Sequence, residues 1–373
     1  MKRVSVLLVL LSLSAFAQLD HIVIPAGTPE DQMLQAISNE QDAQKKQAMY
    51  EDFLQKFAAN PAAVAYGNWQ LSQLFQISGD LQKALDYGDK ALAASPHNLD
   101  ILVSQANVAQ QMKNNEKVMD YAVRGGETYN SIDKQAKPEG MSDQDFASRN
   151  QQDKVSAKSS HEFLEAAAYN TIAGENNAKL RMAYIERFTP AFPNSQFEDQ
   201  VASLAMASLS DLNDMPRLIA YGEKSLKANP NSLSALLLMA GAYVDDPKPG
   251  SVTKAITYSQ KAVEVAKADA PDADRSRKLS AGIAYSTLGY AYMKQDKTAA
   301  AVPELKTAAG LLKAQDDQQY AIALYRLGFA YAKQNKVSDA REVLTEASKI
   351  PGPVQPLAQD LLGKVNSARA KAK

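Results

Sequence analysis

Residues 288–297 of this chain read Leu-Gly-Tyr-Ala-Tyr-Met-Lys-Gln-Asp-Lys, and residues 327–336 repeat them as Leu-Gly-Phe-Ala-Tyr-Ala-Lys-Gln-Asn-Lys. After each copy, small and large apolar residues follow at the spacing of one helical face. They are Ala301, Leu305 and Ala308 after the first copy, and Ala340, Leu344 and Ala347 after the second. A sequence that repeats in this way predicts a solenoid of helical hairpins, in which each unit packs against its neighbours.

The glycines and tyrosines of the repeated stretch have a physical explanation. Gly289 and Gly328 stand inside helical patterns, where glycine costs about 1 kcal/mol relative to alanine. That cost is offset if the missing side chain lets the second helix approach closely, and we expect an alanine of that helix opposite each glycine. Tyr292 and Tyr331 follow a leucine by one helical turn and are expected to fill the hairpin core. These positions therefore predict scaffold rather than ligand contacts.

Earlier parts of the chain keep the same frame in a more diverged form. The skeleton of one hairpin consists of Leu71, Phe75, Gly79, Ala84, Ala91 and Pro96. Motifs related to its residues 84–87 recur at 118–121, 218–221 and 255–258. Pro96, Pro193 and Pro230 are expected to end second helices, because proline cannot continue a helix.

Together these residues resemble the tetratricopeptide repeat, a helix-turn-helix unit with an apolar and a small residue near its start and a closing proline. The match is good over about 282–315 and 321–354, whereas Ala106, Met206 and Ala240 stand where glycine is usual in other units. The resemblance implies an all-α, right-handed superhelical solenoid of antiparallel helix pairs, with about seven to eight hairpins and a C-terminal capping helix. It also implies a concave groove lined by the first helices and a binding role rather than a catalytic one.

The first residues predict export. Lys2 and Arg3 precede an apolar run, and the residues at 15–17 suit signal-peptidase cleavage before Gln18. The apolar run is too short to span a bilayer comfortably, so we expect a cleaved signal and no integral membrane segment in the mature protein. The expected location is periplasmic or secreted, and a chain without cysteine must be held together there by packing alone.

The expected organisation has two arrays of repeats separated by a polar stretch. Its parts are a signal peptide at 1–17, an extended lead-in at 18–30, repeats at 31–127, a polar insertion at 128–160, repeats at 161–350, and a capping helix with a basic tail at 351–373. The polar stretch is interpreted as an insertion that leads into a lengthened first helix at about 143–174. A flexible linker is the alternative. Thr28 and Ser142 are the expected caps of the helices that follow them.

Residues that would carry chemistry are sparse. The histidines are His21, His97 and His161, and His161 has Glu165 where a zinc-protease motif needs a second histidine. His97 stands in a turn and is expected to be solvated. A formal net charge of −1 without a basic stripe gives no support for nucleic-acid binding. We therefore expect no cofactor, no metal and no enzymatic activity.

The candidates for function lie where the family's concave groove would be. They are Tyr66, Trp69, Gln73, Asn107 and Gln110 in early units, and Tyr290, Lys294, Tyr325, Arg326, Phe329 and Lys333 in late units. Trp69 suits a hot spot, but packing against the next unit would also explain it. Lys294 and Lys333 would attract a carboxylate if they are not simply solvated.

The lysine clamp by which some family members hold a C-terminal carboxylate is not reproduced, because Trp69 and Val103 stand at those positions. The leading hypothesis is an exported scaffold that binds a protein or peptide partner. The alternative is a protein that binds small molecules or glycans through groove aromatics. Self-association through the terminal repeat faces stays open.

Overall fold

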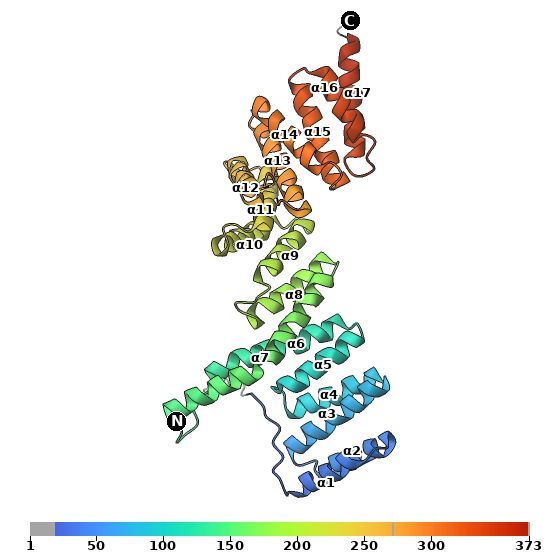
Figure 1. Ribbon diagram of the computed structural model, residues 1–373, viewed down its shortest axis with the longest axis vertical. Helices are drawn as coiled ribbons and strands as arrows, with labels where there is room; N and C mark the ends of the chain where they lie inside the picture. The colour runs from blue at the N-terminus through green and yellow to red at the C-terminus, as the bar shows by residue number, and fades with distance from the viewer. Residues whose placement is uncertain (1–18, 271, 372–373) are drawn as a thin grey trace, which may run out of the picture. The chain divides into compact units, whose positions relative to one another are not determined.

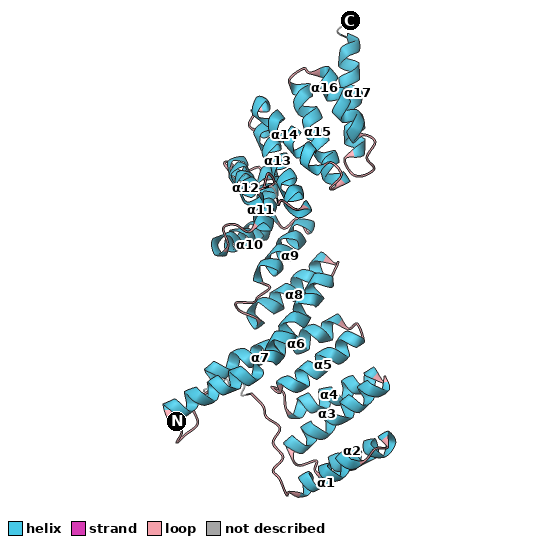
Figure 2. Ribbon diagram, in the orientation of Figure 1, coloured by secondary structure: helices cyan, strands magenta, loops and turns pink. Residues whose placement is uncertain are grey.

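The computed structural model describes residues 19–270 and 272–371, and within these ranges every regular element is helical (Figure 2). Eight consecutive helix pairs are followed by a closing helix, which confirms the all-α fold of stacked hairpins. The chain forms two compact units, one ending at Phe197 and the other starting at Glu198. The predicted signal segment at 1–17 lies outside the described residues.

The first unit contains four hairpins (Figure 1). Its helices are α1 (Pro29–Asn39), α2 (Ala43–Lys56), α3 (Pro61–Ser78), α4 (Leu81–Ala94), α5 (Leu99–Gln111), α6 (Asn115–Ser131), the short 3-10 helix η1 (Ile132–Lys134), α7 (Asp143–Gly174) and α8 (Ala178–Ala191). From α2 to α7 each long helix packs against the next, and α3 also contacts α5, as α5 contacts α7. First helices of neighbouring hairpins therefore lie side by side and form one face of the unit.

Polar side chains set the start of each helix in this unit. Asn60, Asp80, Asn98 and Asn114 accept hydrogen bonds from backbone amides in the first turns of α3, α4, α5 and α6. The turn between α3 and α4 uses Gly79 with a φ of 84°, a conformation that suits glycine. This turn is the one the sequence predicted.

A buried polar contact joins α3, α4 and α5. Gln105 Nε2 of α5 donates to Ser72 Oγ of α3 at 2.8 Å, and Ser72 Oγ donates to the Ala84 carbonyl of α4 at 2.7 Å. Space for the Gln105 amide depends on Gly88, where a Cβ atom would lie 1.7 Å from Gln105 Nε2. The contact fixes α3 against α5 because a buried amide is costly to leave unpaired.

The polar stretch at 128–160 belongs to the first unit and does not separate the two units. Residues 128–131 complete α6, η1 follows, and α7 is one continuous helix over Asp143–Gly174. Ser142 accepts a hydrogen bond from the Asp145 amide and so caps α7, as Thr28 caps α1 through the Asp31 amide. Both caps are those that the sequence predicted.

The second unit contains four more hairpins and the closing helix. Its helices are α9 (Glu198–Asp211), α10 (Met215–Ala228), α11 (Leu233–Asp245), α12 (Ser251–Ala266), α13 (Arg275–Lys294), α14 (Thr298–Leu312), α15 (Asp317–Lys333), α16 (Val337–Ala347) and α17 (Gln355–Lys371). Helix α17 packs on α15 and α16, in the position expected of a cap. The first helices α9, α11, α13 and α15 each contact the next in that series.

The repeated glycines do allow close helix packing, but leucine rather than alanine lies opposite them. A Cβ atom at Gly289 would lie 2.6 Å from Leu305 Cγ, and one at Gly328 would lie 2.5 Å from Leu344 Cγ. The same Cβ atom at Gly289 would lie 3.2 Å from the backbone oxygen of Ala301. Each glycine thus makes room for a large side chain of the second helix, which the alanine expectation missed.

No helix in the described ranges has the length and apolar character needed to cross a membrane.

Candidate partner-binding surfaces

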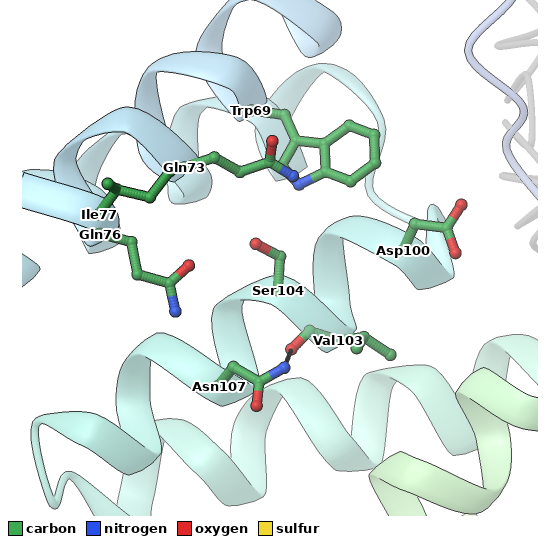
Figure 3. A pocket seen from close by; sticks show the side chains of 8 residues that line it. All are labelled: Trp69, Gln73, Gln76, Ile77, Asp100, Val103, Ser104 and Asn107. Carbon is green, nitrogen blue, oxygen red and sulfur yellow. Dashed lines mark hydrogen bonds between the residues drawn. The ribbon is translucent and has the colours of Figure 1, made fainter. Parts of the chain in front are cut away.

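The first unit carries an open groove of about 540 Å³ between α3 and α5. Figure 3 shows its two walls, one on each helix. They consist of Trp69, Gln73, Gln76 and Ile77 from α3, and Asp100, Val103, Ser104 and Asn107 from α5. Side chains that recur every three or four residues share one face of a helix, and both walls follow this spacing. The groove is therefore formed by one face of each helix.

The groove has an apolar side chain at each end of its α3 wall. Trp69 is partly buried, and its indole Nε1 is enclosed without a hydrogen-bond partner among the described residues. Ile77, two turns further on, is 85% exposed. The amides of Gln73 and Gln76 lie between them. An apolar residue exposed beside a cavity is a typical contact point for a partner.

The α5 wall is mostly polar. Asp100 is exposed, Ser104 is partly buried, and Asn107 Nδ2 donates to the Val103 carbonyl at 3.2 Å. That bond occupies one of the two N–H donors of Asn107 (Figure 3). The wall presents hydroxyl, amide and carboxylate groups, which suit the unpaired backbone groups of an extended peptide.

Three of the five early candidates, Trp69, Gln73 and Asn107, line this groove. Tyr66 instead borders a neighbouring cavity together with Trp69 and packs partly on the core of α1 to α3. Gln110 is exposed in the last turn of α5 and is not among the groove residues. The sequence missed Gln76 and Ile77, although both follow from Trp69 and Gln73 by helical spacing.

The second unit brings cations and aromatic rings together on α13 and α15. The Arg326 guanidinium lies 4.6 Å from the centre of the Tyr290 ring, and its Nη1 donates to Ser286 Oγ at 3.0 Å. Burial lowers the pKa of Arg326, while Tyr290 and the Asp245 carboxylate oppose that shift. Stacking of a guanidinium on an aromatic face is favourable, more so where water is excluded.

The two predicted lysines already have acidic partners within this unit. Lys294 Nζ lies 3.3 Å from Asp245 Oδ1, and Lys333 Nζ lies 3.1 Å from Asp296 Oδ1. Burial lowers the pKa of Lys294, but hydrogen bonds to Tyr290 and Asp245 outweigh it and the net shift is upward. An incoming carboxylate would therefore compete with exposed ion pairs, which contribute little each.

The remaining late candidates differ in their surroundings. Phe329 is 39% exposed, and Lys333 Nζ lies 5.9 Å from the centre of its ring. Tyr325, the neighbour of Arg326 in sequence, lies apart from this group and packs on hydrophobic clusters that include residues of α14 to α17. Adjacent residues on a helix point in directions about 100° apart, which explains the separation.

Two histidines are held in contacts that the sequence did not predict. His97 is not simply a solvated turn residue, because its amide donates to Asp20 Oδ2 at 2.8 Å and its Nδ1 lies 3.6 Å from the same oxygen. The His161 ring lies between those of Tyr129 and Phe192, tilted against both, with ring centres 4.1 and 5.4 Å away. Burial lowers the pKa of His161. His161 is thus part of the packing between α6, α7 and the end of α8.

Solved structures with a similar fold are helical-repeat proteins. The chain is similar to the tetratricopeptide repeat domain of P58(IPK), with a TM-score of 0.34 and 11% identity over 93% of this chain and 99% of that one. It is also similar to a tetratricopeptide repeat protein from Parabacteroides merdae ATCC 43184, with a TM-score of 0.35 and 13% identity over 90% of this chain and 98% of that one.

No protein-family model matches the chain, and no curated protein matches it. The molecule's own helix pairs therefore define the fold as an all-helical array of stacked hairpins within the described residues.

Proposed function

We propose that this chain is an exported, non-enzymatic scaffold that holds an extended protein or peptide segment in the α3–α5 groove. The observation that supports this most directly is the pairing of Trp69 and Ile77 at the two ends of a wall whose centre is polar. Eight residues along a helix span about 12 Å, which is the length of roughly four residues of extended peptide. Two apolar side chains of a partner would thus reach both ends at once.

The polar groups between the two ends would meet the partner's backbone. An extended segment carries an unpaired amide and carbonyl at every residue, and these must find partners when they leave water. Gln73, Gln76 and Asn107 each offer a donor and an acceptor in one side chain. In this arrangement, amides orient the partner's backbone while the indole and the isoleucine select its side chains.

A photo-crosslinking residue at position 73 of the mature protein tests the proposal in the producing cell. We expect one specific crosslinked protein, and we expect Trp69→Ala to remove it. The same residue placed at Gln82, which is exposed on the second helix α4, is the matched control. Identical products from positions 73 and 82, or none from either, would argue against a groove-bound partner.

The side chains of the same groove would also suit a second class of ligand, glycans. The Trp69 ring lies next to Gln73 and Asp100, and sugars present C–H faces to aromatic rings and hydroxyls to amides and carboxylates. A thermal-shift screen with oligosaccharides and cell-wall fragments separates the two classes. A stabilising oligosaccharide whose effect is lost in Trp69→Ala would favour the glycan.

The export part of the proposal is supported by residues 1–17 alone. N-terminal sequencing of the protein purified from fractionated cells tests it, and a mature chain beginning at Gln18 in the periplasmic or secreted fraction is expected. A cytoplasmic chain beginning at Met1 would refute export and leave the groove proposal unaffected.

A further inference from the structure

The lead-in before α1 is bound to the first unit as an extended peptide would be. Residues 19–24 have no helical structure, and Asp20 is held by three hydrogen bonds to the turn that precedes α5. Its amide donates to the His97 carbonyl at 3.3 Å, its carbonyl accepts from Asn98 Nδ2 at 3.2 Å, and its carboxylate accepts from the His97 amide at 2.8 Å. Both backbone groups and the side chain of a single residue are thereby bound.

Asn98 is built into the fold in a way that presents this contact. Its Oδ1 accepts from the Ile101 amide at 3.1 Å and caps α5, which leaves Nδ2 to donate to the Asp20 carbonyl. The side chain is 6% exposed, so its orientation is fixed by packing. One amide thus caps the start of α5 and binds a peptide backbone at the same time.

Charge complements these hydrogen bonds on both sides of the segment. His97 Nδ1 lies 3.6 Å from Asp20 Oδ2, and His21 Nε2 lies 3.7 Å from Asp153 Oδ1 on α7. Asp153 also lies within 3.9 Å of Arg149. The site therefore suits an acidic residue followed by a residue that can carry positive charge.

The segment covers a cavity without filling it. A space of about 300 Å³ remains beneath residues 19–22, bordered by Tyr66 and Trp69 of α3, the start of α5, and Ser156 to Ser160 of α7. None of residues 19–23 is buried, and Val23 is 66% exposed. A peptide with larger side chains could bury more apolar surface here than the lead-in does.

We propose that this cleft between α3, α5 and α7 is a recognition site for an extended peptide with an acidic residue followed by a residue that can carry positive charge, and that residues 19–23 are its exchangeable resident occupant. The cleft is separate from the α3–α5 groove, although Trp69 and Asp100 border both. A partner that binds here displaces the lead-in. The inference does not depend on what the groove holds.

The only tryptophan of the chain, Trp69, borders the cleft and reports its occupancy. The test uses a chain that begins at Ile24, which keeps the contact of Ile24 with the core of α1 to α3. A capped peptide with the sequence of residues 19–23 is titrated while Trp69 emission is recorded, because this peptide contains no tryptophan or tyrosine. We expect a saturable change toward the emission of the full mature chain.

Variants identify the contacts that carry the binding. A peptide with alanine in place of Asp20 should bind about 10-fold more weakly, because it loses the charge-assisted bond. Asn98→Ser keeps an oxygen that caps α5 but lacks the Nδ2 group that donates to the Asp20 carbonyl, and should weaken binding about 5-fold. Asn114→Ser changes the equivalent cap of α6 and should leave binding unchanged. The full mature chain should bind the peptide more weakly than the shortened one, because its own segment competes at high effective concentration.

Two results would overturn the proposal. One is Trp69 emission that does not change when the peptide is added to the shortened chain, provided that the circular dichroism and melting temperature of this chain match those of the mature protein. The other is equal binding of the peptides with and without Asp20. If the shortened chain does not fold, Asp20→Ala in the full mature chain must shift Trp69 emission, and no shift there overturns the proposal equally. A failed crosslink at position 73 would leave these outcomes untouched.

Discussion

Ser72 and Gln105 form a buried hydrogen bond beneath the groove, with Gln105 Nε2 2.8 Å from Ser72 Oγ and neither residue exposed to solvent. Their sequence neighbours Gln73 and Ser104 face the groove from the same two helices. The bond therefore sets the distance and register between the two walls. A binding surface on a repeat protein depends in this way on polar contacts in the layer below it.

Removal of the Ser72 hydroxyl should destabilise the first unit by about 1–3 kcal/mol, because Gln105 Nε2 would remain buried without a partner. Urea denaturation of Ser72→Ala, followed by Trp69 fluorescence, measures this. Ser78→Ala is the control, since it removes a hydroxyl from the exposed end of the same helix. Equal unfolding midpoints for the two variants would show that the buried bond contributes nothing.

Two glycine-to-alanine substitutions in the second unit should change its stability in opposite directions. Gly328→Ala should destabilise the second unit by about 1–3 kcal/mol, because the new methyl group would lie 2.5 Å from Leu344 Cγ. Gly241→Ala in α11 should stabilise it by up to about 1 kcal/mol, because nothing lies within 4 Å of that position and alanine favours a helix. Thermal unfolding by circular dichroism distinguishes them. A higher melting temperature for Gly328→Ala would show that Leu344 does not need the space left by this glycine.

Most of the fold could be predicted from the sequence because it repeats local patterns. A few neighbouring residues are enough to determine such features. Examples are a glycine in a turn, a capping residue such as Ser142, and a proline just past the end of a second helix. The continuous helix α7 starts at the predicted cap. Local signals of this kind do not depend on the rest of the chain.

The surfaces could be predicted only in part, because they depend on contacts between distant segments. Helical spacing from Trp69 and Gln73 would have found Ile77, but nothing near His97 in sequence indicates that Asp20 binds there, 77 residues away. Tyr325 and Arg326 are neighbours in sequence, yet one packs on a hydrophobic core and the other on Tyr290. Whether a residue faces a core or a groove is decided by the neighbouring hairpin.

The stability of the first unit should depend on pH through His161. Burial lowers the pKa of His161 below its ordinary value of 6.5, with Lys154 adding to the shift and Glu165 opposing it. A lowered pKa means that the unfolded state binds a proton more readily than the folded state. The stability that neutral His161 provides is therefore complete above about pH 6.5 and is lost as pH falls through the folded-state pKa.

His161→Phe keeps an aromatic ring between Tyr129 and Phe192 but cannot take up a proton. The free energy of unfolding, measured with urea between about pH 5 and 7.5, should fall less steeply for this variant, with a difference in slope of at most about 1.4 kcal/mol per pH unit. The comparison cancels every pH effect that both proteins share. Parallel pH profiles would show that His161 is protonated equally in both states.

A substitution at Ile77 should affect partner binding without affecting the stability of the first unit. Its side chain is 85% exposed, so Ile77→Ser should change the free energy of unfolding by no more than about 0.5 kcal/mol. The same substitution should reduce crosslinking of the partner from position 73, because it removes the apolar contact at one end of the α3 wall. Leu212→Ser, a change at another exposed aliphatic residue in the second unit, should leave crosslinking intact. If Ile77→Ser crosslinks as fully as Leu212→Ser, the exposed isoleucine does not contact the partner. If Ile77→Ser unfolds the protein, the expected small effect on stability is wrong.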